Sequence, residues 1–457
     1  MKIVDEECVY VMEGEWSPRS VIREIVDSGD QEDPFYVMDL GVVVDRYQHW
    51  KEMMPRVEPF YAVKCNDDRI LVRTLAALGA GFDCASKAEI QLVTSIGVKP
   101  ERIIFANPAK MASHIRYAGA VGAKLMTFDS QTELHKIKKY CPDARLVVRI
   151  RCDAAAAQCP LGIKFGCEPL IEAPRLIKLA NVLNLNVVGV SFHGGSGANE
   201  CAVFARGIAL ANNLFELAER LGAPMSLLDI GGGFSGHTGA SLHEVSRVIN
   251  SALQLFGRSE VRVIAEPGRY FAAAAYTLAA CVHSTRQLSL ESGEEDPREA
   301  HTMYFINDGV YGSFNCVLYD HQHVTPEPLD VAEEGQVATP CSVWGPSCDG
   351  LDCVVSAARL PPLALGSWLT FSDMGAYTLP VASPFNGFPV PRVRTILDQS
   401  LWTVLRGMWP LSELRFVVGE RPAATQHPPH SPAPAGDLAR DPARDPPCAV
   451  YVECALK

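Results

Sequence analysis

The sequence predicts an α/β fold, a (β/α)₈ barrel of the TIM type followed by a mainly antiparallel β domain. Eight short β-rich runs alternate with helical periodicity between about residues 40 and 270. After that region, the pattern changes to short strands separated by Pro, Gly and acidic turns. The 457 residues are also enough for two or three domains of roughly 150 residues each.

The eight β-rich runs are the main evidence for the barrel. The first five begin about 20 residues apart, which is the length of one strand–helix unit with short loops. The last three gaps are longer and leave room for extra loops or helices. The runs are 59–63, 81–85, 102–106, 124–128, 144–150, 187–193, 225–230 and 261–266.

The segments between these runs have helical periodicity. Leu71, Leu75 and Leu78 share one face, and a longer amphipathic stretch over 204–215 ends near Gly222. Strands that alternate with helices form a parallel sheet, and eight units favour a closed barrel. An open doubly wound sheet is the alternative.

The rest of the chain divides by composition. Segments such as TMYFIND (302–308) and SWLTFSD (367–373) are typical of strands, and 422–447 holds eight of the 32 prolines. The expected organisation is an N-terminal segment contributing to the β domain (1–39), the barrel (40–272), the C-terminal β domain (273–415) and a Pro-rich disordered tail (416–457).

Charge and composition exclude several classes of function. A net charge of −12 argues against binding nucleic acid or an anionic membrane. The longest apolar stretch, 270–282, is shorter than the roughly 20 residues of a membrane-spanning helix. The 15 cysteines include no C-x-x-C pair and the N-terminus does not resemble a signal peptide, so we expect reduced thiols, a cytoplasmic protein and no metal site.

Polar residues or glycines occur at the end of every predicted barrel strand. The loops at these ends converge on one mouth, where barrel enzymes place their chemistry. One such residue is usually solvated or structural, whereas eight together indicate a site. They are Lys64, Asp83, Asn107, Asp129, Arg149, His193, Gly231–Gly233 and Glu266.

Two glycine clusters lie at the same mouth. The cluster at 231–236 matches G-x-G-x-x-G, but a dinucleotide fingerprint requires the first unit of an open sheet. After the seventh barrel strand, a backbone nest for one phosphate is favoured, with Gly268 and Arg269 completing it. A plain tight turn is the simpler alternative. In the second cluster, 193–197, Ser196 could add a hydroxyl.

A phosphate site, an imidazole, an acid and a lysine in one barrel mouth indicate pyridoxal 5′-phosphate (PLP). Lys64 would form the Schiff base, and Glu266 would keep the pyridine nitrogen protonated so that the ring withdraws electrons. The flat ring of His193 could stack on the cofactor.

Eight motifs closely resemble those of the eukaryotic ornithine decarboxylase family, over about residues 30 to 410. The resemblance implies a barrel plus a β domain, a head-to-tail homodimer with shared active sites, and PLP as cofactor. Antizyme inhibitors are non-catalytic relatives. The motifs are PFYAVKCN (59–66), VSFHGGSG (190–197), LDIGGGF (228–234), AEPGRY (265–270), NDGVYGSFNCVLYDH (307–321), VWGPSCDGLD (343–352), DMGAYT (373–378) and FNGF (385–388).

The resemblance also implies roles for individual residues. Lys64, Cys348, His193 and Glu266 form the catalytic set, and Cys348 resembles the thiol that protonates the substrate carbon. Asp320 and Asp349 resemble the carboxylates that bind the distal amine of a diamino acid, and Tyr319 and Phe385 are also expected to bind the substrate. In the family, Cys348 and Asp349 reach the site from the partner subunit. The expected cofactor-binding residues are Lys64, Asp83, Glu89, Arg149, His193, Ser196, Gly231, Gly232, Gly233, Glu266, Pro267, Gly268, Arg269 and Tyr377.

Departures from the family pattern leave the substrate open. The 152–163 segment is rich in alanine, and Pro384 precedes the FNGF motif. Gly194 stands where the family usually has a larger apolar residue, and Cys353 stands where a basic residue is common. L-Ornithine is the expected substrate, with lysine or a neutral amino acid such as leucine as alternatives. The basic stretch at 135–139 falls in the region that binds antizyme in the family, so a regulator resembling antizyme inhibitor is another alternative.

Overall fold

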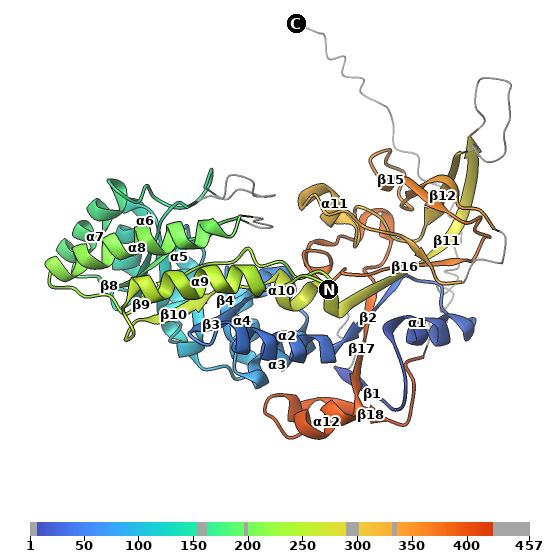
Figure 1. Cartoon of the computed structure of the whole chain (residues 1–457), viewed down its shortest axis with the longest axis horizontal. Helices are drawn as coiled ribbons and strands as arrows, with labels where there is room; N and C mark the ends of the chain where they lie inside the picture. The colour runs from blue at the N-terminus through green and yellow to red at the C-terminus, as the bar shows by residue number, and fades with distance from the viewer. Residues whose placement is uncertain (1–6, 153–161, 196–199, 289–300, 331–335, 424–457) are drawn as a thin grey trace, which may run out of the picture.

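The computed structural model describes residues 7–152, 162–195, 200–288, 301–330 and 336–423. Figure 1 shows the barrel with its helices on one side of the molecule and a second sheet on the other. Within the described ranges, no helix is long and apolar enough to cross a membrane.

The predicted closed barrel is confirmed, and the open-sheet alternative is wrong. Eight parallel strands pair in a ring, and β10 closes it by pairing with β3. The strands are β3 (Val57–Ala62), β4 (Gly81–Cys84), β5 (Ile103–Phe105), β6 (Leu125–Phe128), β7 (Arg145–Arg149), β8 (Asn186–Ser191), β9 (Leu227–Asp229) and β10 (Arg262–Ala265).

Helices cover the outside of this ring (Figure 1). Their apolar faces follow the predicted periodicity, since Leu71 and Leu75 on α3 are fully buried. The helices are α2 (Leu40–Met53), α3 (Arg69–Leu78), α4 (Lys87–Ser95), α5 (Ala112–Ala120), α6 (Gln131–Tyr140), α7 (Glu172–Val182), α8 (Ala202–Arg220), α9 (His243–Phe256) and α10 (Arg269–Ala272).

The barrel interior is filled by apolar side chains, most of them from the strands themselves. Gly81 on β4 is needed there, because a Cβ at this position would lie 2.6 Å from the ring of Phe60. The polar side chains at the strand ends therefore lie next to an apolar layer that fills the barrel interior. The interior cluster consists of Phe60, Ile104, Ala106, Leu125, Val147, Val188, Leu227 and Ile264.

The second sheet is mixed and mainly antiparallel. Segments before and after the barrel contribute to it, since β1 pairs in parallel with β17 and β18, and β2 pairs with β17 and β11. The strands are β1 (Cys8–Met12), β2 (Phe35–Asp39), β11 (Tyr276–Leu288), β12 (His301–Ile306), β13 (Glu327–Pro328), β14 (Thr339–Trp344), β15 (Cys353–Leu360), β16 (Trp368–Phe371), β17 (Arg392–Asp398) and β18 (Arg415–Val418).

Three short helices accompany this sheet within the described residues. The last of its described strands differs from expectation. The sequence interpretation begins the tail at residue 416, whereas β18 continues to Val418 because Phe416 and Val417 pair with β1. Most of the Pro-rich segment lies outside the described residues. The helices are α1 (Pro18–Asp27), α11 (Asn315–Tyr319) and α12 (Gln399–Leu405).

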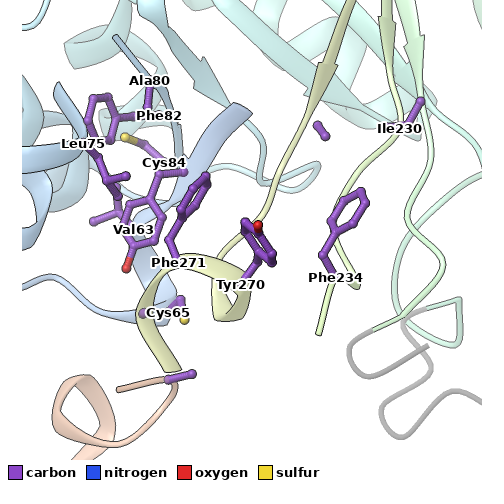
Figure 2. Close-up of a cluster of buried hydrophobic side chains, with 14 of the residues drawn as sticks. Val63, Cys65, Leu75, Ala80, Phe82, Cys84, Ile230, Phe234, Tyr270 and Phe271 are labelled. Atoms are coloured by element: carbon purple, nitrogen blue, oxygen red, sulfur yellow. The ribbon is translucent and has the colours of Figure 1, made fainter. Parts of the chain in front are cut away.

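Helix α10 is held at the barrel mouth by aromatic packing. Figure 2 shows Tyr270 and Phe271 lying between Phe82 and Phe234. Trp50 on α2 completes the cluster, with ring centroids 4.7 Å from Phe234 and 5.5 Å from Tyr270. This packing fixes the backbone that carries Arg269, the first residue of α10.

Candidate active site

A pocket opens at the C-terminal ends of the barrel strands. Most of its residues follow β3, β8, β9 and β10, and one comes from the loop after β16 in the second sheet. The site is therefore built where the barrel meets the β domain. Its lining consists of Ala62, Lys64, His193, Gly233, Phe234, Glu266, Gly268, Arg269 and Tyr377.

Lys64 lies in a short 3₁₀ turn, η1 (Val63–Cys65), directly after β3. Its ammonium forms an ion pair with Asp83, a fully buried residue of β4 that is in register with Ala62. The Lys64 side chain is 41% exposed because it faces the pocket. Burial among protein groups lowers the pKa of Lys64, but the charges of Asp83 and Glu266 outweigh this effect and raise the pKa above its ordinary value. Lys64 is therefore an ammonium that must lose a proton before it acts as a nucleophile.

Glu266 follows β10 and is 6% exposed. Its backbone N–H donates to the carbonyl of Gly231 over 2.7 Å. Burial raises the pKa of Glu266 well above the ordinary carboxyl value, and the nearby carboxylates of Asp229 and Asp83 raise it further. Glu266 is therefore suited to hold a proton beside a ring nitrogen.

Asp229, which the sequence analysis did not single out, lies beside Glu266. It is the last residue of β9, is fully buried, and accepts the N–H of Gly231 over 2.9 Å. Burial raises the pKa of Asp229 to about 7. Its position at the end of the seventh strand was the available signal, but it lies inside the apolar run 225–230.

His193 lies two residues after β8 and lines the pocket. Its Nδ1 accepts the N–H of Gly195 over 2.9 Å, so the ring proton of a neutral imidazole is on Nε2. Burial lowers the pKa of His193 well below its ordinary value, and the charges of Arg149 and Lys64 lower it further. The structure thus presents a neutral, flat ring, as stacking requires.

The glycine cluster after β9 leaves no room for side chains. Gly231 and Gly233 have φ values of 68° and 107°, in the region that favours glycine. A Cβ on Gly232 would lie 2.7 Å from the Glu266 carbonyl oxygen and 2.8 Å from His193 Nε2. The backbone of this cluster therefore stays close to the pocket, as the phosphate-nest interpretation requires.

Arg269 supplies the cation at this end of the pocket. Its guanidinium lies 5.0 Å from the centroid of the Tyr377 ring and forms an ion pair with Asp320. Tyr377 is held by its N–H, which donates to the Cys65 carbonyl over 2.9 Å. Gly268 also packs closely against Cys65, because a Cβ added to Gly268 would lie 2.7 Å from the Cβ of Cys65.

Other predicted cofactor residues surround this pocket without lining it. Glu89 accepts the N–H of Ala85 over 2.6 Å, and burial raises the pKa of Glu89 to about 7. Arg149 is the last residue of β7 and is 9% exposed. Pro267 accepts the N–H of Ala62, joining the ends of β10 and β3. Ser196 lies outside the described residues.

The remaining predicted residues form a second cluster on loops of the β domain. The hydroxyl of Tyr311 donates to Asp349, and the rings of Tyr311 and Phe385 have centroids 4.3 Å apart. Cys348 is exposed, and its N–H donates to Asn386 over 3.3 Å. None of these residues lines the pocket of their own chain.

Tyr319 and Asp320 differ in exposure although they are neighbours. Tyr319, at the end of α11, is 70% exposed. Asp320 is 8% exposed and reaches the pocket through its ion pair with Arg269. Of the two carboxylates predicted to bind a distal amine, the structure therefore places Asp320 against the pocket-lining Arg269 and Asp349 in the second cluster.

The residues present fit PLP. Two buried carboxylate oxygens, Asp83 Oδ1 and Asp229 Oδ2, have no hydrogen-bond partner among the described residues. The pocket has a lysine amine for an aldehyde and a neutral imidazole for an aromatic ring. For a phosphate it has the backbone of Gly231–Gly233, called the glycine cradle below, beside Arg269. When bound, PLP supplies an electron-withdrawing ring that stabilises negative charge on a substrate carbon.

The closed barrel, the lysine after its first strand and the glycine cradle after its seventh define the class of barrel-type PLP enzymes. The model of the family "Pyridoxal-dependent decarboxylase, pyridoxal binding domain" matches residues 40–273. The chain belongs to this family of PLP-dependent amino-acid decarboxylases.

Individual relatives agree with this assignment. Ornithine decarboxylase of Rattus norvegicus is 46% identical over 389 residues, covering 83% of this chain and 84% of the relative. Antizyme inhibitor 2 of Xenopus laevis is 42% identical over 412 residues, covering 88% and 90%. The crystal structure of the Paramecium bursaria Chlorella virus arginine decarboxylase bound to agmatine superposes with a TM-score of 0.78 at 36% identity, covering 83% of this chain and all of the viral chain.

Proposed function

We propose that this protein converts L-ornithine to putrescine and carbon dioxide. Lys64 would bind the cofactor aldehyde, Arg269 and the glycine cradle would bind its phosphate, and Glu266 would hold a proton at its ring nitrogen. His193 would stack on the ring and exclude water from that face. Cys348 would deliver one proton to the substrate carbon that loses carbon dioxide.

The observation that carries the choice of a diamino acid is Asp320 at the edge of the pocket. This carboxylate is 8% exposed, and a buried carboxylate is costly unless a cation accompanies it. It already pairs with Arg269, and a distal ammonium would bring a second cation to the same group. The rat relative is named an ornithine decarboxylase, and the viral neighbour binds agmatine, which also carries a distal cation.

The departure at Gly194 gives little support to a neutral substrate. A Cβ at this position would lie 2.8 Å from Val203 Cγ1. Val203 therefore occupies the space that a larger residue would need, so the glycine does not enlarge the pocket.

A homodimer completes the proposed site. Cys348 and Asp349 belong to a cluster on β-domain loops that does not line the pocket of its own chain. Exposed apolar side chains belong to this cluster, including Phe385, whose ring packs against Tyr311, and Leu351, whose N–H donates to Asp349. We propose that Cys348 and Asp349 of the partner subunit enter the pocket, so that each site contains both chains.

The test is a turnover screen that measures release of carbon dioxide from L-ornithine, L-lysine and L-leucine. Wild-type protein with PLP should act on ornithine in preference to the other two. Lys64→Ala, the control, should show no turnover and lose the visible absorbance of the lysine-bound cofactor. Turnover of leucine but not ornithine would contradict the substrate while leaving the cofactor chemistry in place.

A regulatory role through antizyme is a second candidate. The antizyme inhibitor relative favours it, as do the basic residues of α6, although Lys136 is paired there with Glu133. The complete lysine, acid and thiol set argues against regulation as the sole function. A pull-down in which the protein fails to retain antizyme would dismiss this role.

We also propose a cytoplasmic location. The 12 cysteines in the described part of the chain are free thiols, as is usual in a reducing compartment. Imaging of a tagged full-length chain in cells tests this proposal, and exclusive localisation to an organelle would contradict it.

A further inference from the structure

Asp229 connects the glycine cradle to Glu266. Its Oδ1 accepts the N–H of Gly231, and the carbonyl of Gly231 accepts the N–H of Glu266. Gly231 has no room for a side chain, because a Cβ there would lie 2.2 Å from the Phe192 carbonyl oxygen. The Asp229 side chain therefore fixes the turn that sets the backbone of Glu266.

The two carboxyl groups also interact through charge. Both residues are buried, and burial raises the pKa of each. The charge of Asp229 raises the pKa of Glu266 further. Two neighbouring buried carboxylates do not both ionise readily, so the pair retains one proton. Asp229 Oδ2 has no hydrogen-bond partner among the described residues, which leaves an oxygen available for that proton.

Other charged groups face the pair from the surrounding strands. Asp83 on β4 raises the pKa of both Asp229 and Glu266, whereas Arg149 at the end of β7 lowers both. Lys64 after β3 lowers the pKa of Glu266. His193 is neutral and does not offset the charge. Asp83 is already paired with Lys64, so Asp229 and Glu266 are the two carboxyls left to share a proton.

We propose that Asp229 is a positioning residue for Glu266: it anchors the turn whose carbonyl binds the backbone N–H of Glu266, and it shares with Glu266 one positive charge. That charge is a proton in the cofactor-free protein and the protonated ring nitrogen of PLP in the loaded protein. The inference rests on the proposed role of Glu266 beside that nitrogen. Asp229 itself does not line the pocket.

The first experiment measures cofactor affinity and uses a phosphate-bearing PLP analogue in which CH replaces the ring nitrogen. Asp229→Asn keeps an oxygen acceptor for Gly231 but removes the charge. It should weaken PLP binding about tenfold, as loss of an outer partner typically does, and leave analogue binding nearly unchanged. Glu266→Gln should behave likewise, and the double variant should lose little more than either single one.

The second experiment is infrared spectroscopy of the cofactor-free protein. In difference spectra against wild type, D229N and E266Q should each lose one C=O band of a protonated buried carboxyl, because one remaining carboxyl can ionise. The band of Glu89 is common to all three proteins and cancels in the difference. Circular dichroism establishes that each variant is folded. If D229N does not fold, the difference spectrum of E266Q decides, and no loss of a C=O band there overturns the proposal.

The outcomes separate this proposal from the one on which it rests. Equal loss of PLP and analogue affinity in D229N, while E266Q still discriminates between the two ligands, overturns the role of Asp229 alone. Absence of discrimination in E266Q overturns the role of Glu266 and, with it, this inference.

Discussion

The guanidinium of Arg269 is ion-paired with the carboxylate of Asp320. The residue expected to bind the cofactor phosphate is thus in direct contact with the residue expected to bind the distal amine of the substrate. With both ligands bound, phosphate, Arg269, Asp320 and ammonium would alternate in charge. Cofactor binding and substrate recognition would then share one charged group.

Asp320→Asn should separate these two roles. Loss of the charge should raise KM for L-ornithine at least tenfold, because a buried charge pair is typically worth about 2 kcal/mol or more. Binding of PLP should not weaken, since the carboxylate competes with phosphate for Arg269. Steady-state kinetics and cofactor titration test this, with Asp330→Asn on the surface as the matched control. An unchanged KM would rule out Asp320 as the amine-binding group.

Mixing two inactive variants should restore activity if the sites are shared. Lys64→Ala and Cys348→Ala each disable every site in their own homodimers. Random exchange of subunits gives half heterodimers, each with one intact site, so about a quarter of wild-type activity should return.

A second mixture is the control for this complementation. Lys64 and Glu266 line the pocket of one chain. A mixture of Lys64→Ala with Glu266→Ala should therefore remain inactive. Recovery in both mixtures, or in neither, would contradict the proposed exchange of Cys348 between subunits.

Gly232→Ala should abolish cofactor binding with little loss of fold. The added Cβ would meet the Glu266 carbonyl oxygen and the His193 ring at less than 3 Å, and overpacking of this kind typically costs about 1–3 kcal/mol. If His193 moved to relieve this clash, its imidazole ring would leave the position in which it stacks on the cofactor. Absorbance titration with PLP is the measurement. Gly407→Ala, where no atom lies within 4 Å of the new Cβ, should bind PLP normally.

Glu89 should make the stability of the protein depend on pH. Its folded-state pKa is about 7 against an ordinary value of 4.5, so the folded state prefers the protonated form. This contribution is complete below pH 4.5 and is lost as the pH rises through 7, for a total of up to about 3 kcal/mol. Glu89→Gln should flatten the decline in urea-unfolding free energy over that interval, whereas the exposed Glu101→Gln should not.

The barrel could be predicted because its pairing is local. Each strand from β3 to β9 pairs with the next one along the chain. The spacing of apolar residues also changes between strand-like and helical periodicity along the sequence, which identifies both the strands and the helices. Residues at strand ends, such as Lys64 and Glu266, could be found because the fold requires those ends to converge. Asp229 was missed because its polarity is hidden inside an apolar run, and burial beside Glu266 becomes visible only in three dimensions.

The second sheet could not be ordered from the sequence. Its strands β1 and β2 precede the barrel and pair with β17, which follows it by more than a hundred residues. Periodicity identifies strands but contains no information on partners so far apart. For the same reason, the positions of Cys348 and Asp349 outside their own pocket could not be deduced from spacing.

The pairing of β1 with both β17 and β18 also determines the order in which the protein can fold during synthesis. The ribosome can release a complete barrel sequence while β1 and β2 still lack these partners, since β18 is among the last strands translated. Until then, both strands expose edges that can pair with other chains. A protein shortened before β17 should therefore keep a barrel but aggregate through its N-terminal strands.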